Sequence, residues 1–450
     1  MVIAGPSAGS VRVMTRGRPT WTNWAGNQSC SPASIERPTT EDELVAIVRR
    51  AAEAGARVKV VGAGHSFTSI ACTDGALVDL DGYGEVVWID PVARQACVQA
   101  GIPLHRLNVE LARHGLAFEN LGDIAYQSIA GATQTATHGT GAAFRNLSAA
   151  IIGMRIIAGD GTVHDCSDGH DADLLEVARV GLGALGVLST VTIQCVSAFN
   201  LHAIEDVARV DDLLEHLDDH VDGHDHFEFN WVPNTRWALT KHNRRTDEPS
   251  RPRPRWREVR DDILINNVGF DAVMRVGRRR NNLLPKAAKR LPSTGRADYI
   301  DASYKVFASP RLVRFYEMEY AIPREALIEA FGRLRTLVDR QGRYIGFPVE
   351  VRFVAADDIP LSTATGRATA YVACHVYQGT PYDQYFQGVE AIMNDYDGRP
   401  HWGKMHFQTA ETLAARYPRW ADFAAARRRL DPAGTFANPY LDRVLGPIAG

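Results

Sequence analysis

The chain has 450 residues, of which 45% are hydrophobic and 23% are charged, and its formal net charge is −3. A chain of this length is too long for a single hydrophobic core, so we expect two domains. The small net charge gives no electrostatic argument for a nucleic-acid partner. No apolar run reaches the ~18 residues that span a bilayer, and the amino-terminal residues lack the apolar core of a signal peptide.

Six cysteines are scattered along the chain without CxxC or metal-ligand spacing: Cys30, Cys72, Cys97, Cys166, Cys195 and Cys374. This pattern favours reduced thiols in a cytoplasmic protein. The segment "HVDGHDH" at 220–226 has His and Asp spacing that could bind zinc, but no fourth ligand is evident. We therefore expect no bound metal.

The first part of the chain, up to about residue 195, reads as an α+β unit of short strands and glycine turns. A helix is expected over 40–54, because Thr40 and Glu43 have capping-box spacing and Gly55 is a stop signal. Alternation and turn residues predict strands at 58–61, 75–82 and 93–101, a helix at 102–115, and three strands between 150 and 195.

The second part alternates apolar and polar residues in "HFEFNWVP", "RWALTKHN" and "VRFYEMEYAIP", as half-exposed antiparallel strands do. Helical periodicity predicts helices at 324–338 and 382–395, and further strands are expected at 347–355 and 370–378. Strands accompanied by helices in this way predict one mixed sheet covered by helices. The join between the two parts is expected near 195–210.

A basic stretch occupies 251–260 and 275–290. One interpretation is contact with an anionic membrane surface or an acidic partner. The other is a solvated loop followed by an amphipathic helix, with the charge balanced elsewhere in the chain. We favour the second interpretation, so peripheral membrane contact is not favoured.

The run at 58–61 leads into a glycine turn, Gly62-Ala63-Gly64, and then His65. A Rossmann fingerprint is excluded, because its third glycine position is Phe67 and no helical period follows. A nucleophile elbow and a Walker motif are also absent. A second segment, 128–141, consists almost entirely of Ser, Gly, Ala and Thr and carries another histidine. Two such loops favour a large diphosphate cofactor over tight packing alone.

The motifs "GAGHSFT", "NLGDIAYQSIAGATQTATHGTG", "GLGALGV" and "HWGK" occur in order along the chain. Together they resemble the vanillyl-alcohol-oxidase flavoprotein superfamily, and within it the aldonolactone oxidoreductases, with alditol oxidase as a close relative. The resemblance runs from Trp21 to Leu445. It implies an α+β, two-domain FAD-binding fold: an FAD domain at 20–195, a substrate-binding cap at 196–410, and a segment at 411–450 that returns to the FAD domain.

For the cofactor, the resemblance implies FAD bonded covalently to His65, since family members with this histidine attach the flavin through it. A loop histidine hydrogen-bonded to backbone is the alternative. The residues expected to line FAD are Val60, Val61, Gly62, Ala63, Gly64, His65, Ser66, Ser128, Gly131, Ala132, Thr133, Gln134 and Thr135. Those expected close to it are Gly122, Asp123, Thr137, His138, Gly139, Val187 and His401.

Strand periodicity points independently to a reacting centre. Glu350 and Arg352 share one face of a strand, and His375 and Tyr377 share one face of another. Pattern alone would favour a solvated sheet face with a surface salt bridge. The resemblance instead implies a substrate site, because the E-x-R pair and Lys404 of HWGK match substrate-site residues of the family.

The implied reaction is oxidation at C2 of a sugar lactone, with hydride transfer to the flavin. Arg352 and Lys404 are expected to stabilise developing negative charge, and Glu350 to hold the sugar hydroxyls. His375 and Tyr377 are expected to orient the substrate, with proton acceptance as a further role for His375. Asp123 stands where the family often has a small polar residue near the substrate.

The electron acceptor is left open between O₂ and a quinone or cytochrome. Gly122 occupies the position where a small residue admits oxygen in this family, which permits a reaction with O₂ without requiring it. An alditol oxidase acting on an open-chain polyol is the main alternative function. A non-catalytic flavin-binding module is the other, although such a module has no need of Glu350, Arg352 and Lys404 together.

Overall fold

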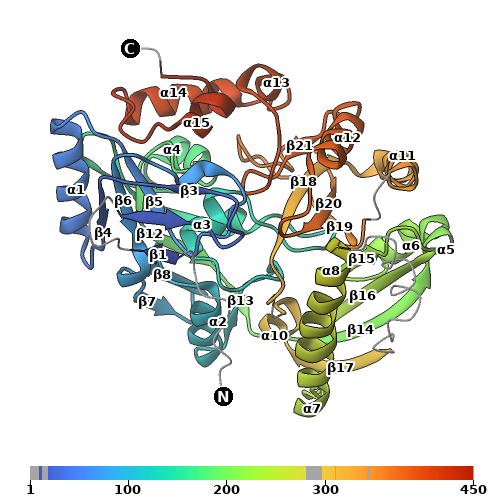
Figure 1. The fold of residues 1–450 in the computed structure, drawn as a ribbon. Helices are drawn as coiled ribbons and strands as arrows, with labels where there is room; N and C mark the ends of the chain where they lie inside the picture. The colour runs from blue at the N-terminus through green and yellow to red at the C-terminus, as the bar shows by residue number, and fades with distance from the viewer. Residues whose placement is uncertain (1–9, 13–18, 280–295, 310, 342–344, 449–450) are drawn as a thin grey trace.

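The computed structural model describes residues 10–12, 19–279, 296–309, 311–341 and 345–448 (Figure 1). The strands of the amino-terminal part are β1 (Ser10–Arg12), β2 (Thr20–Thr22), β3 (Ser29–Cys30), β4 (Ser34–Glu36), β5 (Val58–Val61), β6 (Ala76–Asp79), β7 (Val86–Asp90), β8 (Gln95–Gln99), β9 (Leu116–Ala117), β10 (Ile151–Ile157), β11 (Val163–Ser167), β12 (Val187–Gln194) and β13 (Val196–Ser197). Its helices are α1 (Glu41–Glu53), α2 (Leu104–Arg113), α3 (Ile129–Gln134) and α4 (Ala172–Ala178), with short 3₁₀ turns η1 (Ser69–Ala71), η2 (Leu80–Gly82) and η3 (Leu147–Ala150).

Two sheets organise this part. A parallel sheet of three strands has the order β4-β6-β5, and an antiparallel sheet of five strands has the order β11-β10-β12-β8-β7. Helix α1 forms as its sequence predicts: the Thr40 hydroxyl accepts from the Glu43 amide, and Leu44, Ile47 and Val48 are buried. The Glu43 carboxylate accepts from the Thr39 amide, one residue before the N-cap.

The second part contains β14 (Asn200–Arg209), α5 (Val210–Glu215), α6 (Leu217–Asp222), β15 (His226–Trp231), β16 (Trp237–Thr246), α7 (Arg255–Glu258), the π-helical η4 (Val259–Gly269), α8 (Phe270–Arg279), β17 (Ala297–Ala302), α10 (Ser303–Phe307), β18 (Phe315–Pro323), η6 (Arg324–Ala326), α11 (Leu327–Arg340), β19 (Val349–Val354), β20 (Thr369–Tyr377), α12 (Asp383–Asn394) and β21 (Arg399–Pro400). The chain ends with α13 (Ala410–Ala414), α14 (Trp420–Leu430) and α15 (Pro439–Leu445).

Eight of these strands form one sheet in the order β17-β14-β16-β15-β19-β20-β18-β21. Every neighbouring pair is antiparallel, so the expectation of a mixed sheet is corrected in this respect. Helices α5 and α6 join β14 to β15, which run in the same direction, but β16 lies between them. Helix α11 joins β18 to β19, and β20 lies between those two strands. Both helical crossovers therefore connect parallel strands that are not neighbours.

The two faces of this sheet differ in character. One face carries Phe229, Val351, Val372 and Tyr320 among others, and these pack with α5, α6, α11 and α12 in one apolar cluster. In Figure 1, α5, α6 and α11 lie on the side of the sheet away from the blue and teal amino-terminal part. The other face carries the alternate residues of the same strands; they include Glu228, Glu317, Glu350 and Arg352 as well as a small apolar cluster of Ala321, Val354 and Tyr371.

The carboxy-terminal helices α13, α14 and α15 lie against the amino-terminal part (Figure 1), and their side chains join its core cluster. Of the basic stretch, residues 280–290 lie outside the described residues, while 255–279 form α7, η4 and α8. Among the described helices, none combines the length and the apolar character needed to cross a bilayer.

Candidate active site

A cavity opens where strand β5 ends in the glycine turn and α3 begins, with about 920 Å³ of empty space that includes its mouth. The lining residues that the sequence predicts are Val60, Val61, Gly62, Ala63, Gly64, His65, Ser66, Ser128, Gly131, Gln134 and Thr135. The lining residues that sequence reasoning missed include Trp21, Lys59, Ile70, Ala71, Leu182, Gly183, Gly186 and Leu188. The sequence predicts Ala132 and Thr133 on this wall and Val187 close to it; in the structure all three are completely buried.

The glycine turn needs its glycines because two segments meet there. A Cβ at Gly62 would lie 2.2 Å from the Ser128 hydroxyl oxygen, and Gly64 has a φ of +67°. Ser128 in turn caps α3 by accepting from the Gly131 amide. The turn therefore exposes backbone directly to the cavity, as diphosphate-binding loops do.

Lys59 is one of the lining residues of the cavity. Its ammonium donates to the carbonyls of Gly183 and Phe436 at 3.1 and 3.2 Å. Burial, with the charge of Arg427, lowers the pKa of Lys59 to about 7. This side chain ties the loop at 181–186 to the carboxy-terminal segment.

His65 stands at the end of the cavity that leads toward the second part of the chain. Burial, and secondarily the nearby Lys404, lower the pKa of His65 to about 4, so its imidazole is neutral at neutral pH. Its Nε2 is buried and has no hydrogen-bond partner among the described residues. Its ring lies 5.2 Å from that of Trp24. The hydroxyl of Thr137 is also buried and has no hydrogen-bond partner among the described residues. A buried, neutral and unpaired imidazole on the cavity wall, next to the glycine turn, fits a large cofactor in this cavity.

Two further predicted segments run side by side beyond the cavity. A Cβ at Gly139 would lie 2.4 Å from the Leu121 carbonyl oxygen, and one at Gly122 would lie 3.1 Å from the His138 carbonyl oxygen. Gly122 and Gly139 thus permit the close approach of 120–123 and 137–139. Asp123, His138 and Thr137 are thereby brought to the junction with the eight-stranded sheet.

Arg352 is the centre of the polar sheet face. Its guanidinium donates to Glu350 at 2.6 Å and to Glu228 at 3.1 Å, and it lies 3.4 Å from Asp123. All of these side chains are at most 18% exposed. Burial acts against the charged form, but the three carboxylates raise the pKa of Arg352 above its ordinary value. Arg352 therefore remains a cation in a largely water-free site.

The carboxylates around Arg352 differ in their protonation. Burial, with repulsion from Asp123 and Glu228, raises the pKa of Glu350 to about 7, although Arg352 opposes this. For Asp123 burial is outweighed by Arg352 and Arg311, which lower its pKa below the ordinary value. Arg311 donates to Asp123 through its Nε at 3.1 Å. One carboxyl of the cluster is thus poised to exchange a proton near neutral pH, and its neighbour stays ionised.

A second ionic group joins Lys404, Glu317 and His375. Lys404 donates to one oxygen of Glu317, and His375 Nε2 lies 3.5 Å from the other. The Nδ1 of His375 donates to the Pro348 carbonyl at 3.0 Å. Burial favours the neutral ring, but Glu317 and Glu350 together raise the pKa of His375. The Nδ1 of His375 therefore carries a proton, and the carboxylates beside the ring favour its protonated form.

The "HWGK" turn that carries Lys404 is fixed by backbone pairing. The amides of His401 and Met405 donate to the carbonyls of Glu319 and Glu317 on β18. The Gly403 carbonyl accepts from the Phe67 amide, which follows the glycine turn closely. The turn thus links the sheet to the segment that follows the glycine turn of the cavity.

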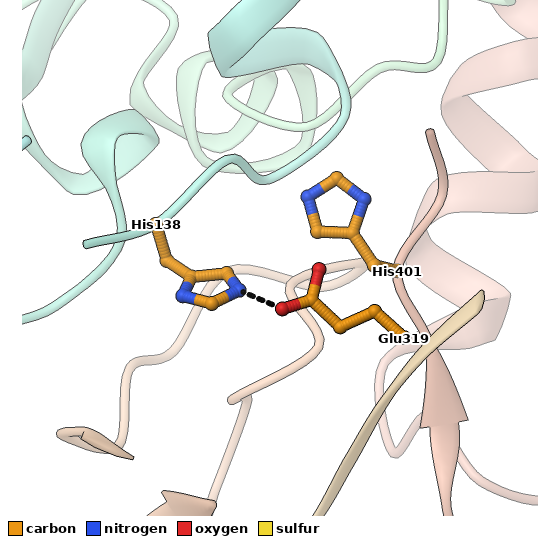
Figure 2. A group of neighbouring side chains, drawn as sticks. All are labelled: His138, Glu319 and His401. Atoms are coloured by element: carbon orange, nitrogen blue, oxygen red, sulfur yellow. Dashed lines mark ion pairs between the residues drawn. The ribbon is translucent and has the colours of Figure 1, made fainter. Parts of the chain in front are cut away.

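A third group, His138, Glu319 and His401, converges from three segments (Figure 2). His138 Nε2 lies 3.3 Å from a Glu319 oxygen, and the His138 ring stacks on Tyr371 at 3.6 Å. The ligand-type atoms of the three side chains lie within 4.8 Å of one another. The Gly403 amide, however, donates to His401 Nδ1 at 3.0 Å, so the ring proton lies on Nε2 and that nitrogen offers no lone pair. The hydrogen bonds therefore favour a polar network over a set of metal ligands.

Other predicted site residues lie elsewhere. Tyr377 shares the face of His375, but its hydroxyl donates to Asp271 on α8 at 2.7 Å, and it packs with Trp24 and Met274. It therefore belongs to the rim of the sheet and not to the Arg352 cluster. In the segment at 220–226, His226 is buried and its Nδ1 donates to the Thr140 carbonyl.

Sequence reasoning missed Glu228, Glu317 and Glu319, of which one belongs to each of the three groups. The signal for two of them was present in "FYEMEYAIP", where Glu317 and Glu319 alternate with the buried Met318 and Tyr320. The same period-2 argument that identified Glu350 and Arg352 applies to them.

Comparisons with known proteins agree with this arrangement. The family described as D-arabinono-1,4-lactone oxidase matches residues 191–444, and the FAD binding domain family matches residues 32–167. An L-gulono-1,4-lactone dehydrogenase of Mycobacterium tuberculosis is 48% identical over 430 residues, covering 95% of this chain and all of the relative.

More distant relatives extend the likeness. An L-gulonolactone oxidase of Bos taurus is 32% identical, covering 94% of this chain and 97% of the relative. An alditol oxidase of a Streptomyces species is 30% identical, covering 94% of this chain and 98% of the relative. Among solved structures, a solvent-stable cholesterol oxidase has a TM-score of 0.78 with 17% identity, covering 96% of this chain and 98% of its own. That last likeness concerns the fold alone.

Proposed function

The chain belongs to the aldonolactone oxidoreductase family of FAD-dependent enzymes, and from this premise we propose that it oxidises an aldono-1,4-lactone of the L-gulono-1,4-lactone type at its C2 hydroxyl. The name of the 48%-identical relative supports the substrate class. The observation that carries the chemistry is the buried Arg352, held by Glu228 and Glu350 of the sheet and by Asp123 of the amino-terminal part. An alditol oxidase is the weaker alternative, since its named relative is 30% identical.

When bound, FAD accepts the hydride that leaves the carbon undergoing oxidation. The protein must bind the lactone, exclude water and manage the hydroxyl proton. Arg352 and Lys404 stabilise negative charge that develops on the substrate oxygen, because buried cations act strongly in a site of low dielectric constant. Glu317 keeps Lys404 oriented, and Glu228 does the same for Arg352.

Glu350 is the proton acceptor in this proposal. Its pKa of about 7 lets it exist as a carboxylate above neutral pH and take up the hydroxyl proton. Glu350 is preferred to His375 for this step, since the Nδ1 of His375 donates to the Pro348 carbonyl and its Nε2 faces Glu317. His375 also helps to fix the orientation of Glu317.

We further propose that His65 bonds covalently to FAD. The support is its neutral imidazole, its buried Nε2 without a partner among the described residues, and its place on the cavity wall. The electron acceptor is O₂ or a quinone or cytochrome. The named relatives include both oxidases and dehydrogenases, which keeps both classes of acceptor open. Gly122 has no side chain that would block O₂, so it permits a reaction with O₂.

The test begins with acid precipitation of the holoprotein and of His65→Ala. Yellow fluorescence that stays with the wild-type polypeptide and leaves the variant supports the covalent bond, whereas flavin released from both contradicts it. Turnover is then measured with gulono-, galactono- and arabinono-lactones against xylitol and sorbitol. Each substrate is assayed with O₂, a quinone and cytochrome c in turn. Activity confined to the polyols would overturn the lactone assignment.

A further inference from the structure

Two cysteines from separate segments meet beside the cofactor cavity. Cys30 ends strand β3, and Cys72 follows the turn η1. Both are partly exposed to solvent. They pack at the edge of a small cluster formed by Trp21, Val61 and Leu77.

The segments that carry Cys30 and Cys72 run side by side: the Ala33 amide donates to the carbonyls of Asp74 and Gly75, and Ser34 pairs with Ala76 in the parallel sheet. Both cysteines pack against the same cluster. The neighbouring Cys72 side chain lowers the pKa of Cys30 to about 7, although burial opposes this. The pKa of Cys72 is raised, first by the Cys30 side chain and then by burial. Cys30 is therefore the more acidic thiol of the pair and supplies a thiolate near neutral pH.

The remaining cysteines provide a contrast within the same chain. Cys97, Cys166, Cys195 and Cys374 are buried, and burial raises the pKa of each. They are thiols at neutral pH and are shielded from solvent. Among the described cysteines, only Cys30 combines partial exposure, a lowered pKa and a second cysteine on the adjacent segment.

We propose that Cys30 and Cys72 form an oxidisable dithiol that hydrogen peroxide converts to an intramolecular disulfide. The Cys30 thiolate attacks one peroxide oxygen, the O–O bond breaks, and hydroxide leaves as Cys30 becomes a sulfenic acid. The Cys72 sulfur then attacks the Cys30 sulfur, the S–O bond breaks, and water leaves. In total two thiols lose two electrons and two protons, and one peroxide becomes two waters. The inference does not depend on the proposed substrate.

The position of the pair gives this modification a structural consequence. The cofactor cavity is lined by a neighbour of each cysteine. Trp21 on β2 pairs with Cys30 on β3, and Ala71 precedes Cys72 in the chain. The turn η1 is otherwise held by Asn438, which donates to the carbonyls of Ser69, Ile70 and Cys72. A Cys30–Cys72 bond adds a covalent link from the amino-terminal hairpin to the same turn.

The test uses the flavin-loaded wild-type protein. It is treated with hydrogen peroxide, alkylated with N-ethylmaleimide and digested without reductant. We expect one crosslinked peptide that joins Cys30 to Cys72, loss of two free thiols per chain, and recovery of both with dithiothreitol. The thermal unfolding midpoint should rise on oxidation and return on reduction. Cys72→Ser should abolish the crosslink and leave a trappable sulfenic acid at Cys30, while the matched variant Cys97→Ser should behave as the wild type.

Full alkylation of Cys30 and Cys72 after peroxide treatment would overturn the proposal. So would oxidation of Cys30 to a sulfinic acid in the wild type with Cys72 still free. The peptide map of the wild type decides between these results, even if a variant fails to fold.

Discussion

The cofactor cavity and the polar face of the eight-stranded sheet meet at one junction, yet they are built by opposite means. The cavity wall consists mainly of consecutive short segments, 60–66 and 127–135, with glycine and small side chains. The sheet face instead gathers charged side chains from β15, β18, β19 and β20, which are far apart in the sequence. One region offers backbone and shape, and the other offers charge.

The two regions should therefore respond differently to amino-acid substitutions. In the cavity a single added methyl group meets backbone or a neighbouring side chain, so the cost is steric and independent of pH. On the sheet face the shape can be kept while a charge is removed, and the cost then depends on the protonation of the partners that remain. The predictions below use this contrast, from the largest expected effect to the smallest.

Arg352→Met should lower kcat/KM by about 10³-fold, the loss expected when a buried charge that complements the transition state is removed. The flavin content should stay close to that of the wild type, because Arg352 belongs to the sheet face and not to the cavity wall. Steady-state kinetics together with the flavin absorbance per chain check both points. The control is Arg335→Met on α11, whose ion pair with Asp211 is at the surface. A loss below threefold would refute the role of Arg352.

Gly62→Ala should reduce the amount of flavin that purifies with the protein by about 10-fold or more, since the new Cβ would lie 2.2 Å from the Ser128 hydroxyl oxygen. Combination with Ser128→Gly removes the clash and should restore part of the binding. Gly332→Ala on α11 is the matched control, because a Cβ there meets nothing within 4 Å. Equal flavin content in Gly62→Ala and wild type would show that the segments carrying Gly62 and Ser128 can move apart without loss of flavin binding.

Glu317→Gln should lower kcat about 10-fold, because Lys404 and His375 both lose the carboxylate that orients them. The loss of negative charge also lowers the pKa of His375, so its protonated form disappears at lower pH than in the wild type. The alkaline limb of the pH–rate profile should therefore move toward neutral pH. Glu329→Gln in the first turn of α11 serves as control. An unmoved limb in Glu317→Gln would exclude His375 as its origin.

The smallest effect concerns the acid limb of the same profile. Glu350 has a raised pKa of about 7, so it is protonated and unable to accept a proton below that pH. Wild-type kcat/KM should rise with pH through this region, by about 10-fold per unit well below the pKa. Glu350→Gln should be slower throughout and should lack this rise. A variant that kept the full acid limb would assign the limb to another group.

The sequence alone was sufficient for the parts of the molecule that are local. The turn from Gly62 to His65 and the cap at Thr40 lie in the structure where their motifs predicted. Strand alternation likewise placed Glu350 and Arg352 together, and the structure joins them at 2.6 Å. In each case the determining residues are neighbours in the chain or alternate along one strand.

The rest depends on contacts that no local pattern encodes. The contact of Asp123 with Arg352 and Arg311 joins the two parts of the chain. The order of β16 between β14 and β15, and of β20 between β18 and β19, decides that the sheet is antiparallel. Tyr377 follows the predicted alternation, but α8 supplies Asp271 and draws it to the rim. Periodicity gives the face of a strand, and only packing gives the neighbour on that face.

The most direct test of the account is anaerobic mixing of the flavin-loaded protein with L-gulono-1,4-lactone, followed by the visible absorbance of the flavin. This measurement needs no assumption about the electron acceptor. The account predicts rapid bleaching by the lactone and much slower bleaching by xylitol at the same concentration. Bleaching by xylitol with no response to gulono-, galactono- or arabinono-lactone would contradict it.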